Sequence, residues 1–148
     1  MPIKQAQASD LDRLVPLFDG YRQFYGQSSD PDGARAFLAE RMARAESVIF
    51  LALDDDGTAL GFTQLYPSFT SAGMKHIFVL NDLYVAPAGR CKGIGKRLLQ
   101  AAADHAREQG AARLTLSTAI DNHTAQLLYE ANGWVRDTHY FAYNLALT

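Results

Sequence analysis

The chain has 148 residues and a formal net charge of −2, a length typical of one domain with a full hydrophobic core. This charge disfavours a nucleic-acid-binding surface, no apolar run approaches the ~20 residues of a membrane span, and no signal-peptide hydrophobic stretch is visible. Cys91 is the only cysteine and the four histidines are scattered, which excludes an internal disulfide and predicts no metal site. We expect a cytoplasmic protein that contacts neither membrane nor nucleic acid.

The first half of the chain predicts one strand, two helices and a hairpin. Apolar positions recur at helical spacing after Ser9, and a continuous apolar run begins at Val48. Asp-Gly at 56–57 is a strong hairpin signal. The expected elements are a strand at 3–8, a helix from an N-cap at Ser9 to Tyr25, a helix from about 33 to 45, a central strand at 48–53, a turn at 54–57 and a strand at 59–66.

The second half alternates strands and helices. The expected elements are a polar loop at 67–73, a strand at 75–85, a helix at 96–109, a strand at 112–118, a helix at 122–132 and one or two strands at 135–147. A hairpin series followed by alternating helix and strand indicates an α/β protein, specifically an α+β mixed sheet with helices on its faces. Several folds share this order, so the motifs must distinguish them.

The segment Arg90-Cys91-Lys92-Gly93-Ile94-Gly95 is the most informative stretch. It lies between a predicted strand and a predicted helix, where a glycine loop and unpaired helix N–H groups suit a phosphate. Arg90, Lys92, Lys96 and Arg97 add local positive charge. A phosphate-bearing small ligand is therefore expected here, although an ordinary strand-to-helix turn would have the same pattern.

Three phosphate-loop patterns compete for this segment. A P-loop requires Ser or Thr after Gly95-Lys96, where Arg97 stands, and a Rossmann fingerprint requires glycine where Leu98 stands. The pattern Gln/Arg-x-x-Gly-x-Gly/Ala matches at every defined position. It resembles the pyrophosphate loop of the GNAT superfamily of N-acetyltransferases, and residues 122–134 resemble a second segment of that family.

The resemblance implies one GNAT-like acyl-CoA N-acyltransferase domain over residues 1–148, with the element order βααβββαβαβ and acetyl-CoA as cosubstrate. Main-chain groups of the loop would cradle the pyrophosphate, and those of the preceding strand would bind the pantetheine arm. The cofactor-binding residues implied are Leu83, Tyr84, Val85, Arg90, Cys91, Lys92, Gly93, Ile94, Gly95, Lys96, Asn122 and Ala125.

Acetyl transfer to an amine requires the neutral amine. An amine with a pKa near ~10.4 is protonated at pH 7, a handicap of roughly 4 kcal/mol. Asp82 interrupts an apolar strand and could hold the cation and accept its proton. Asn81-Asp82-Leu83-Tyr84-Val85 resembles the Glu-Asp-Phe-Phe-Val of polyamine-type acetyltransferases, but Asn81 replaces the glutamate, which puts a doubly cationic substrate in doubt. A purely structural carboxylate is the alternative, and His139 is a second candidate base.

The leaving thiolate requires a proton, and the resemblance points to Tyr129 as its donor. Asn122 and Tyr129 are two helical turns apart and share a helix face. A phenol is protonated at neutral pH. A tyrosine that only packs against the helix is the alternative. Cys91 lies in the loop, so direct transfer is favoured over an acyl-enzyme.

The acceptor pocket is expected between the N-terminal helices and the loop after Tyr66. Aromatic walls suit an amine by cation–π contact, while an aromatic core stripe is the alternative. The candidate substrate-binding residues are Tyr21, Arg22, Tyr25, Tyr66 and Asn81.

The sequence thus predicts an N-acetyltransferase that moves an acetyl group from acetyl-CoA to a primary amine of a small molecule. A protein N-terminal or lysine acetyltransferase and a non-catalytic acyl-CoA-binding module are the alternatives. A homodimer is compatible with the resemblance.

Overall fold

The computed structural model describes residues 2–148, which fall into two compact units, residues 2–117 and 118–148. The expectation that residues 1–148 form a single domain stays a prediction. Among the described residues, no helix is both long and apolar enough to cross a membrane.

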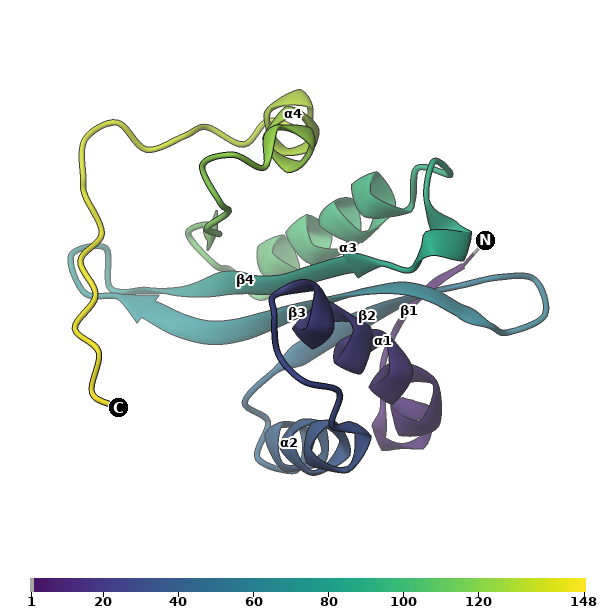
Figure 1. Cartoon of the computed structure of the whole chain (residues 1–148). Coiled ribbons are helices and arrows are strands. Elements are labelled where there is room, and N and C mark those ends of the chain that lie inside the picture. The colour runs from purple at the N-terminus through teal and green to yellow at the C-terminus, as the bar shows by residue number, and fades with distance from the viewer. Residues whose placement is uncertain (1) are drawn as a thin grey trace. The chain divides into compact units, whose positions relative to one another are not determined.

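The first unit is built on a five-stranded mixed sheet (Figure 1). Its strands follow the chain order β1-β2-β3-β4-β5; the first four pair antiparallel, and β5 pairs parallel to β4. The strands are β1 (Ile3–Gln5), β2 (Val48–Leu53), β3 (Ala59–Thr70), β4 (Lys75–Val85) and β5 (Leu114–Thr115). The mixed sheet confirms the predicted fold class.

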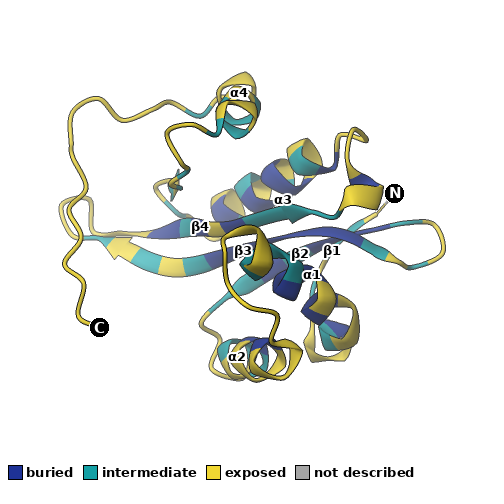
Figure 2. Cartoon of the chain, in the orientation of Figure 1, coloured by how far each residue is buried: buried dark blue, intermediate teal, exposed yellow. Residues whose placement is uncertain are grey.

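Helices cover both faces of this sheet. The helices of this unit are α1 (Leu11–Phe24), α2 (Pro31–Ala43) and α3 (Ile94–Glu108), with short 3₁₀ turns η1 (Ala8–Asp10) and η2 (Pro87–Gly89). Figure 1 shows α1 and α2 on one face and α3 on the other. Leu14, Leu38 and Phe62 centre the core under α1 and α2, and Leu60, Ile94 and Leu98 fill the side under α3 (Figure 2).

Capping groups correct two helix starts predicted from the sequence. Ser9 is not the N-cap: Asp10 Oδ2 accepts from the Gln7 N–H at 2.8 Å, so η1 precedes α1. The second helix begins at Pro31, two residues before the predicted start, because the Asp30 carboxylate accepts from the Gly33 N–H at 3.0 Å. Proline suits this first turn because its missing N–H would have no helical partner.

The loop predicted at 67–73 is wrong, because β3 continues to Thr70. Its last four residues pair with the beginning of β4, from Pro67 opposite Phe78 to Thr70 opposite Lys75. The Phe69 and His76 rings, on facing positions, lie 4.9 Å apart. Cross-strand pairing therefore outweighs the polar, proline-containing composition of this stretch.

The second unit contains α4 (His123–Ala131), as the sequence predicts. The final strands predicted at 135–147 are wrong: within the described residues 2–148, the last strand is β5. The predicted strand at 112–118 is likewise reduced to the two residues of β5. A strand exists only where a neighbour satisfies its main-chain hydrogen bonds, and alternating composition alone does not supply one. The order is therefore βααβββαβα, without the last predicted β.

Candidate active site

The glycine loop turns into α3 through left-handed backbone. Gly93 is the N-cap of α3 with φ of 73°, and Cys91 has φ of 63°. The helix begins at Ile94, two residues before the predicted start, with Arg97 N–H bonded to the Gly93 carbonyl at 3.2 Å. The main-chain N–H groups of residues 94–96, which precede Arg97, have no carbonyl partner inside the helix. Their dipoles favour an anion.

Cationic side chains surround this helix start. Lys92, Lys96 and Arg97 are exposed and take part in none of the ion pairs found within residues 2–148. Arg90 instead donates through Nε to the Val85 carbonyl at 3.2 Å, which ties the loop to the end of β4. Uncommitted cations and helix N–H groups together fit a pyrophosphate.

Beside this loop, β4 loses its outer neighbour. β5 pairs only with Phe78 and Val79, so along 80–85 the described residues give β4 a strand partner on the β3 side alone. Main-chain groups of Leu83, Tyr84 and Val85 thus lie along an open stretch of sheet edge. This is the stretch that the resemblance assigns to the pantetheine arm, and that assignment stays a prediction.

A β-bulge in β4 sets the direction of the side chains at the site. Gln64 faces Asp82, but the next residue, Leu65, faces Leu80, which leaves Asn81 as the extra residue. Bulges redirect side chains and are frequent beside active sites. Here Asn81 is exposed while Asp82 is buried.

The carboxylate of Asp82 is enclosed by amide donors. Only 1% of Asp82 is exposed. Gln64 Nε2 donates to Oδ2 at 2.6 Å, and Asn81 Nδ2 donates to Oδ1 at 2.8 Å. Thr63 Oγ1 donates to the main-chain carbonyl of Asp82 at 2.8 Å. No ion pair among residues 2–148 includes Asp82, so amide and hydroxyl groups, not a cation, compensate its charge.

Burial raises the pKa of Asp82 above its usual range. Hydrogen bonds from Asn81, Gln64 and Tyr21 oppose that shift without cancelling it. Desolvation disfavours the charged form, so this carboxylate binds a proton more tightly than an exposed one. A buried carboxyl group with a raised pKa is a candidate general base.

Two tyrosines border this carboxylate. The Tyr21 hydroxyl, from α1, donates to the Asn81 carbonyl at 3.1 Å. Burial, and then the charge of Asp82, raise the pKa of Tyr21 and of Tyr66, so both stay protonated hydroxyls at neutral pH. The Tyr21 ring also contacts the Tyr25 ring in a tilted arrangement, with 5.0 Å between ring centroids. The structure therefore gathers Tyr21, Tyr66 and Asn81 around Asp82.

Two of the predicted acceptor-binding residues lie apart from the carboxylate itself. Arg22 Nη1 donates to the Ser28 carbonyl at 2.9 Å and lies 3.8 Å from Asp19 Oδ1, so it braces the connection between α1 and α2. Tyr25 is the C-cap of α1 and is half exposed, and it reaches the cluster only through its ring contact with Tyr21. A direct contact of Arg22 with substrate stays a prediction.

In the second unit, α4 holds the remaining predicted residues. Asn122 is the N-cap of α4, and its Oδ1 accepts from the Ala125 N–H at 3.3 Å. Tyr129 is half-buried, and its ring centroid lies 6.1 Å from that of Trp134. The Trp134 N–H donates to the Tyr129 carbonyl at 3.1 Å. Helix α4 thus fixes the positions of Asn122, Ala125 and Tyr129 relative to one another.

Sequence reasoning missed Gln64, the closest donor to the Asp82 carboxylate. Thr63 and Gln64 interrupt an otherwise apolar strand, and this signal could have identified them. It also missed Gly89: a Cβ there would lie 3.0 Å from Leu60 Cβ and 3.1 Å from Ile94 Cδ1. Glycine at position 89 therefore lets the loop pack closely on β3 and α3.

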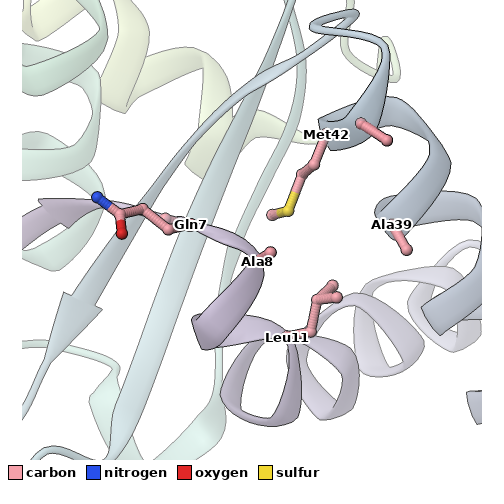
Figure 3. A pocket seen from close by; sticks show the side chains of 7 residues that line it. Gln7, Ala8, Leu11, Ala39 and Met42 are labelled. Carbon is pink, nitrogen blue, oxygen red and sulfur yellow. The ribbon is translucent and has the colours of Figure 1, made fainter.

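The cavities of the first unit include the following two. One, of about 310 Å³, lies between η1, α1 and α2 (Figure 3). Its lining contains Gln7 and otherwise small or apolar side chains such as Leu11 and Met42, so it offers no group for proton transfer. The other, of about 470 Å³, is lined by residues that include Arg13, Leu60 and Tyr84.

No cluster of three or more His, Cys, Asp or Glu side chains arranged to hold a metal occurs in the described part of the chain. The groups around Asp82 are amides and phenols.

Comparison with known proteins identifies the family. The model of the Acetyltransferase (GNAT) family matches residues 14–134. The chain is 51% identical over 145 residues to the uncharacterized N-acetyltransferase YhfO of Bacillus subtilis (strain 168), covering 98% of this chain and 97% of that protein. It is 34% identical to the D-amino-acid N-acetyltransferase HPA3 of Saccharomyces cerevisiae, and the match covers 86% of this chain and 80% of that protein.

Solved structures agree with this assignment. The crystal structure of a probable acetyltransferase matches with a TM-score of 0.96 and 46% identity, covering 100% of this chain and 99% of that one. The resemblance inferred from the glycine loop and the segment 122–134 is confirmed. The chain belongs to the GNAT family, whose cosubstrate is acetyl-CoA, and is an N-acetyltransferase.

Proposed function

We propose that this enzyme transfers the acetyl group of acetyl-CoA directly to a primary amine of a small molecule, with Asp82 as general base. The observation that carries the proposal is the buried carboxylate of Asp82, enclosed by amide donors and bordered by Tyr21 and Tyr66. An amine that reaches this carboxylate meets both a negative charge and aromatic rings, which is the environment that binds ammonium groups.

The cosubstrate supplies an activated acetyl thioester. Main-chain N–H groups at the start of α3 would bind its pyrophosphate, with Lys92, Lys96 and Arg97 balancing the charge. The left-handed Gly93 and the close packing at Gly89 support this placement, because both keep the loop backbone accessible to a ligand. Leu83, Tyr84 and Val85 would bind the pantetheine arm through their main-chain groups, and Asn122 and Ala125 are the expected contacts from α4.

Asp82 would bind the ammonium form of the acceptor and take its proton. Its raised pKa brings the carboxyl group closer to the working pH, where a general base is most effective. Gln64 Oε1 is buried without a hydrogen-bond partner among the described residues. Rotating the Gln64 amide by half a turn would present that oxygen to a protonated Asp82, so Gln64 can support the carboxyl group in both states.

Tyr129 would donate the proton that the departing CoA thiolate needs. A tyrosine hydroxyl can act as a general acid when it lies within hydrogen-bond reach of the leaving group. Cys91 would have no role as an acyl carrier, since it lies exposed in the phosphate loop. The acetyl group therefore moves in one step from thioester to amine.

The acceptor class follows from the charge at the site. One carboxylate stands here, with the neutral Asn81 beside it, so the site matches one ammonium group better than two. The relative HPA3 is named a D-amino-acid N-acetyltransferase, which supports a small acceptor such as an amino acid. Arg22 would then be the candidate partner of a substrate carboxylate.

A screen of acceptors tests the proposal. The wild-type enzyme is supplied with acetyl-CoA and with D- and L-amino acids, polyamines, aminoglycosides or peptides with free N-termini, and CoA thiol release is measured. With the best acceptor, Asp82→Asn should lower kcat/KM by about 10²–10⁴-fold and Tyr129→Phe by about 10–10²-fold. Both variants should bind acetyl-CoA with unchanged Kd by calorimetry.

The outcomes separate the alternatives. Turnover confined to peptides would favour a protein N-terminal or lysine acetyltransferase. Tight acetyl-CoA binding without turnover on any amine would favour a non-catalytic binding module. Full activity of both variants would remove Asp82 and Tyr129 from the mechanism.

A further inference from the structure

Three buried side-chain atoms within residues 2–148 have no hydrogen-bond partner, and they gather around Tyr66. They are Arg41 Nε, Ser47 Oγ and Gln64 Oε1. Leaving a buried polar atom without a partner destabilises a fold, so such atoms are few in most proteins. Three of them in one part of the first unit indicate a place where a polar ligand completes the bonding.

The sheet places Gln64 and Ser47 on either side of Tyr66. Gln64 and Tyr66 are two residues apart in β3, so their side chains leave the same face of the sheet. This is the face that α1 and α2 cover, because Phe62, two residues before Gln64, belongs to the core under these helices. The β2–β3 register, continued by one residue beyond β2, puts Ser47 opposite Tyr66. Both polar side chains therefore lie next to the Tyr66 ring.

Arg41 reaches the same place from α2. The Glu46 N–H donates to the Arg41 carbonyl at 2.9 Å, which brings the end of α2 beside Ser47. The Arg41 guanidinium lies 4.9 Å from the centroid of the Phe37 ring, and only 23% of its side chain is exposed. The positive charge of Arg41 opposes part of the rise in the pKa of Tyr66. The guanidinium therefore lies within electrostatic range of the Tyr66 hydroxyl.

Two glutamates hold the guanidinium of Arg41 without satisfying all of its donors. Glu40 Oε2 lies 3.0 Å from Nη2, and Glu46 Oε1 lies 3.2 Å from Nε. Nε is nevertheless buried without a hydrogen bond. Both glutamates are about half exposed, and ion pairs in contact with solvent are weak. The glutamates thus orient the guanidinium, and a carboxylate that approaches from the buried side would bind it more strongly.

The cluster has hydrogen-bond donors at one end and acceptors at the other. The guanidinium of Arg41 and the hydroxyl of Ser47 are the donors, and the carboxylate of Asp82 and Gln64 Oε1 are the acceptors. Tyr66 stands between them, since the charges of Asp82 and Arg41 both act on its hydroxyl. The Cα atoms of Ser47 and Gln64 are one strand and two residues apart, roughly 8 Å, and their side chains narrow this gap. Its polarity and size match a small molecule that carries both an ammonium group and a carboxylate.

We propose that Arg41 and Ser47 bind the carboxylate of the acceptor, so that the enzyme selects amino acids over amines that lack a carboxylate. This inference rests on the proposed function, because it places the amine of the same molecule at Asp82. Both ends of the zwitterion, and the buried atoms around Tyr66, then have partners.

Arg22 is less suited to this role than Arg41. Its Nη1 donates to the Ser28 carbonyl at 2.9 Å and lies 3.8 Å from Asp19 Oδ1. These contacts commit Arg22 to the connection between α1 and α2, whereas Arg41 keeps a buried donor unpartnered. Arg41 and Arg22 are therefore competing candidates that one experiment can separate.

The test measures kcat/KM, by CoA thiol release, for D- and L-amino acids and for the amines that lack only their carboxylate, such as phenylalanine and phenethylamine. The quantity compared between variants is the ratio of the two values, which cancels differences in amine basicity. Arg44→Gln is the matched control for Arg41→Gln. Arg44 also ends α2 and lies 3.1 Å from Glu40, but 65% of its side chain is exposed.

The wild type should prefer the amino acid of each pair. Arg41→Gln should lower the ratio by about 10–100-fold, because a charge-assisted pair with the carboxylate is lost. Ser47→Ala removes one neutral donor and should lower the ratio by about 3–10-fold. Arg44→Gln should leave the ratio unchanged.

The wild-type ratio does not depend on any variant folding. A wild type that acetylates the matched amines at least as well as the amino acids would overturn this inference and leave the proposed function intact. An equal loss on both substrates in Arg41→Gln, or a ratio that falls in Arg22→Gln but not in Arg41→Gln, would also overturn it. An absence of turnover with every amine would overturn the proposed function and this inference together.

Discussion

The loop at residues 90–96, where we propose that the pyrophosphate binds, and the Asp82 cluster, which we propose activates the amine, are built in opposite ways. The loop is exposed, contiguous in sequence and dependent on main-chain conformation. The Asp82 cluster is buried and depends on side chains of α1, β3 and β4 that meet only in the folded chain. Binding of the cosubstrate and activation of the amine should therefore respond to different substitutions.

Their electrostatics differ for the same reason. Lys92, Lys96 and Arg97 act in solvent, where single charges contribute modestly and are screened by salt. Asp82 acts in a buried setting, where each hydrogen bond to the carboxylate alters its pKa. Loop variants should change Kd for CoA, and cluster variants should change the pH dependence of turnover.

The largest expected effect is a difference in CoA binding between substitutions of two glycines at the two ends of α3. Gly93 has φ of 73° and Gly110 has φ of 72°, and a Cβ at either position meets no atom within 4 Å. Gly93→Ala and Gly110→Ala should thus cost a similar ~1–2 kcal/mol of left-handed strain. In the proposed site only Gly93→Ala would place a methyl group beside the pyrophosphate, and this variant should raise the Kd for CoA by about 10–100-fold.

Calorimetry with CoA and thermal unfolding of both variants check this expectation. Similar unfolding temperatures with unequal Kd values support a phosphate site at the loop. Equal Kd values for Gly93→Ala, Gly110→Ala and the wild type would mean that the pyrophosphate does not approach this turn.

A smaller effect is expected from removing a donor inside the buried cluster. Gln64→Leu deletes the 2.6 Å hydrogen bond to Asp82 Oδ2, and losing a donor to the carboxylate raises its pKa further. The acidic limb of the kcat/KM profile should move to higher pH by up to ~1 unit, with up to about a tenfold lower rate below the new midpoint. The Kd for CoA should not change.

Thr63→Val is the matched control for this prediction. Thr63 neighbours Gln64 in β3 and is also fully buried, but its hydroxyl donates to the main-chain carbonyl of Asp82. The control should therefore lower stability without moving the midpoint. A profile that shifts equally in both variants would assign the effect to general loosening of the sheet.

The contrast between loop and cluster also explains what the sequence could predict. Local patterns predict the loop motif, the strand at 75–85 and the helix around Tyr129. The structure has both this strand and this helix where the sequence predicts them. Gln64 could not be matched to Asp82 beforehand, because their pairing depends on the β3–β4 register and the bulge at Asn81. Such a register is set by the whole sheet.

The two wrong strand and loop predictions have the same origin. Residues 67–70 resemble a loop in composition but are strand because β4 continues alongside them. Residues 135–147 resemble a strand in composition, but the described structure contains no strand there. Local composition misleads in both places, because a strand forms only where a neighbour distant in the sequence satisfies its main-chain hydrogen bonds.

The smallest effect concerns stability, and its sign follows from the raised pKa of Asp82. The folded state binds this proton more tightly than the unfolded chain, whose carboxyl pKa is ~3.9. The contribution of Asp82 to the free energy of unfolding is therefore largest below that pH and falls as pH rises through the folded-state pKa. The Asp82→Asn variant has no ionisable group at this position, so its free energy of unfolding does not fall for this reason as pH rises.

Asp82→Asn should accordingly be more stable than the wild type at pH 7 to 8, with the difference shrinking toward pH 4. The added amide group can donate to Gln64 Oε1, which is buried and otherwise unpartnered, once the Gln64 amide rotates. Since ~1 kcal/mol corresponds to about 2–4 °C at this chain length, a gain of a few degrees is expected in thermal unfolding. A variant that is inactive yet more stable would show that Asp82 is retained for chemistry at the expense of the fold. A variant destabilised at every pH would instead give Asp82 a structural role.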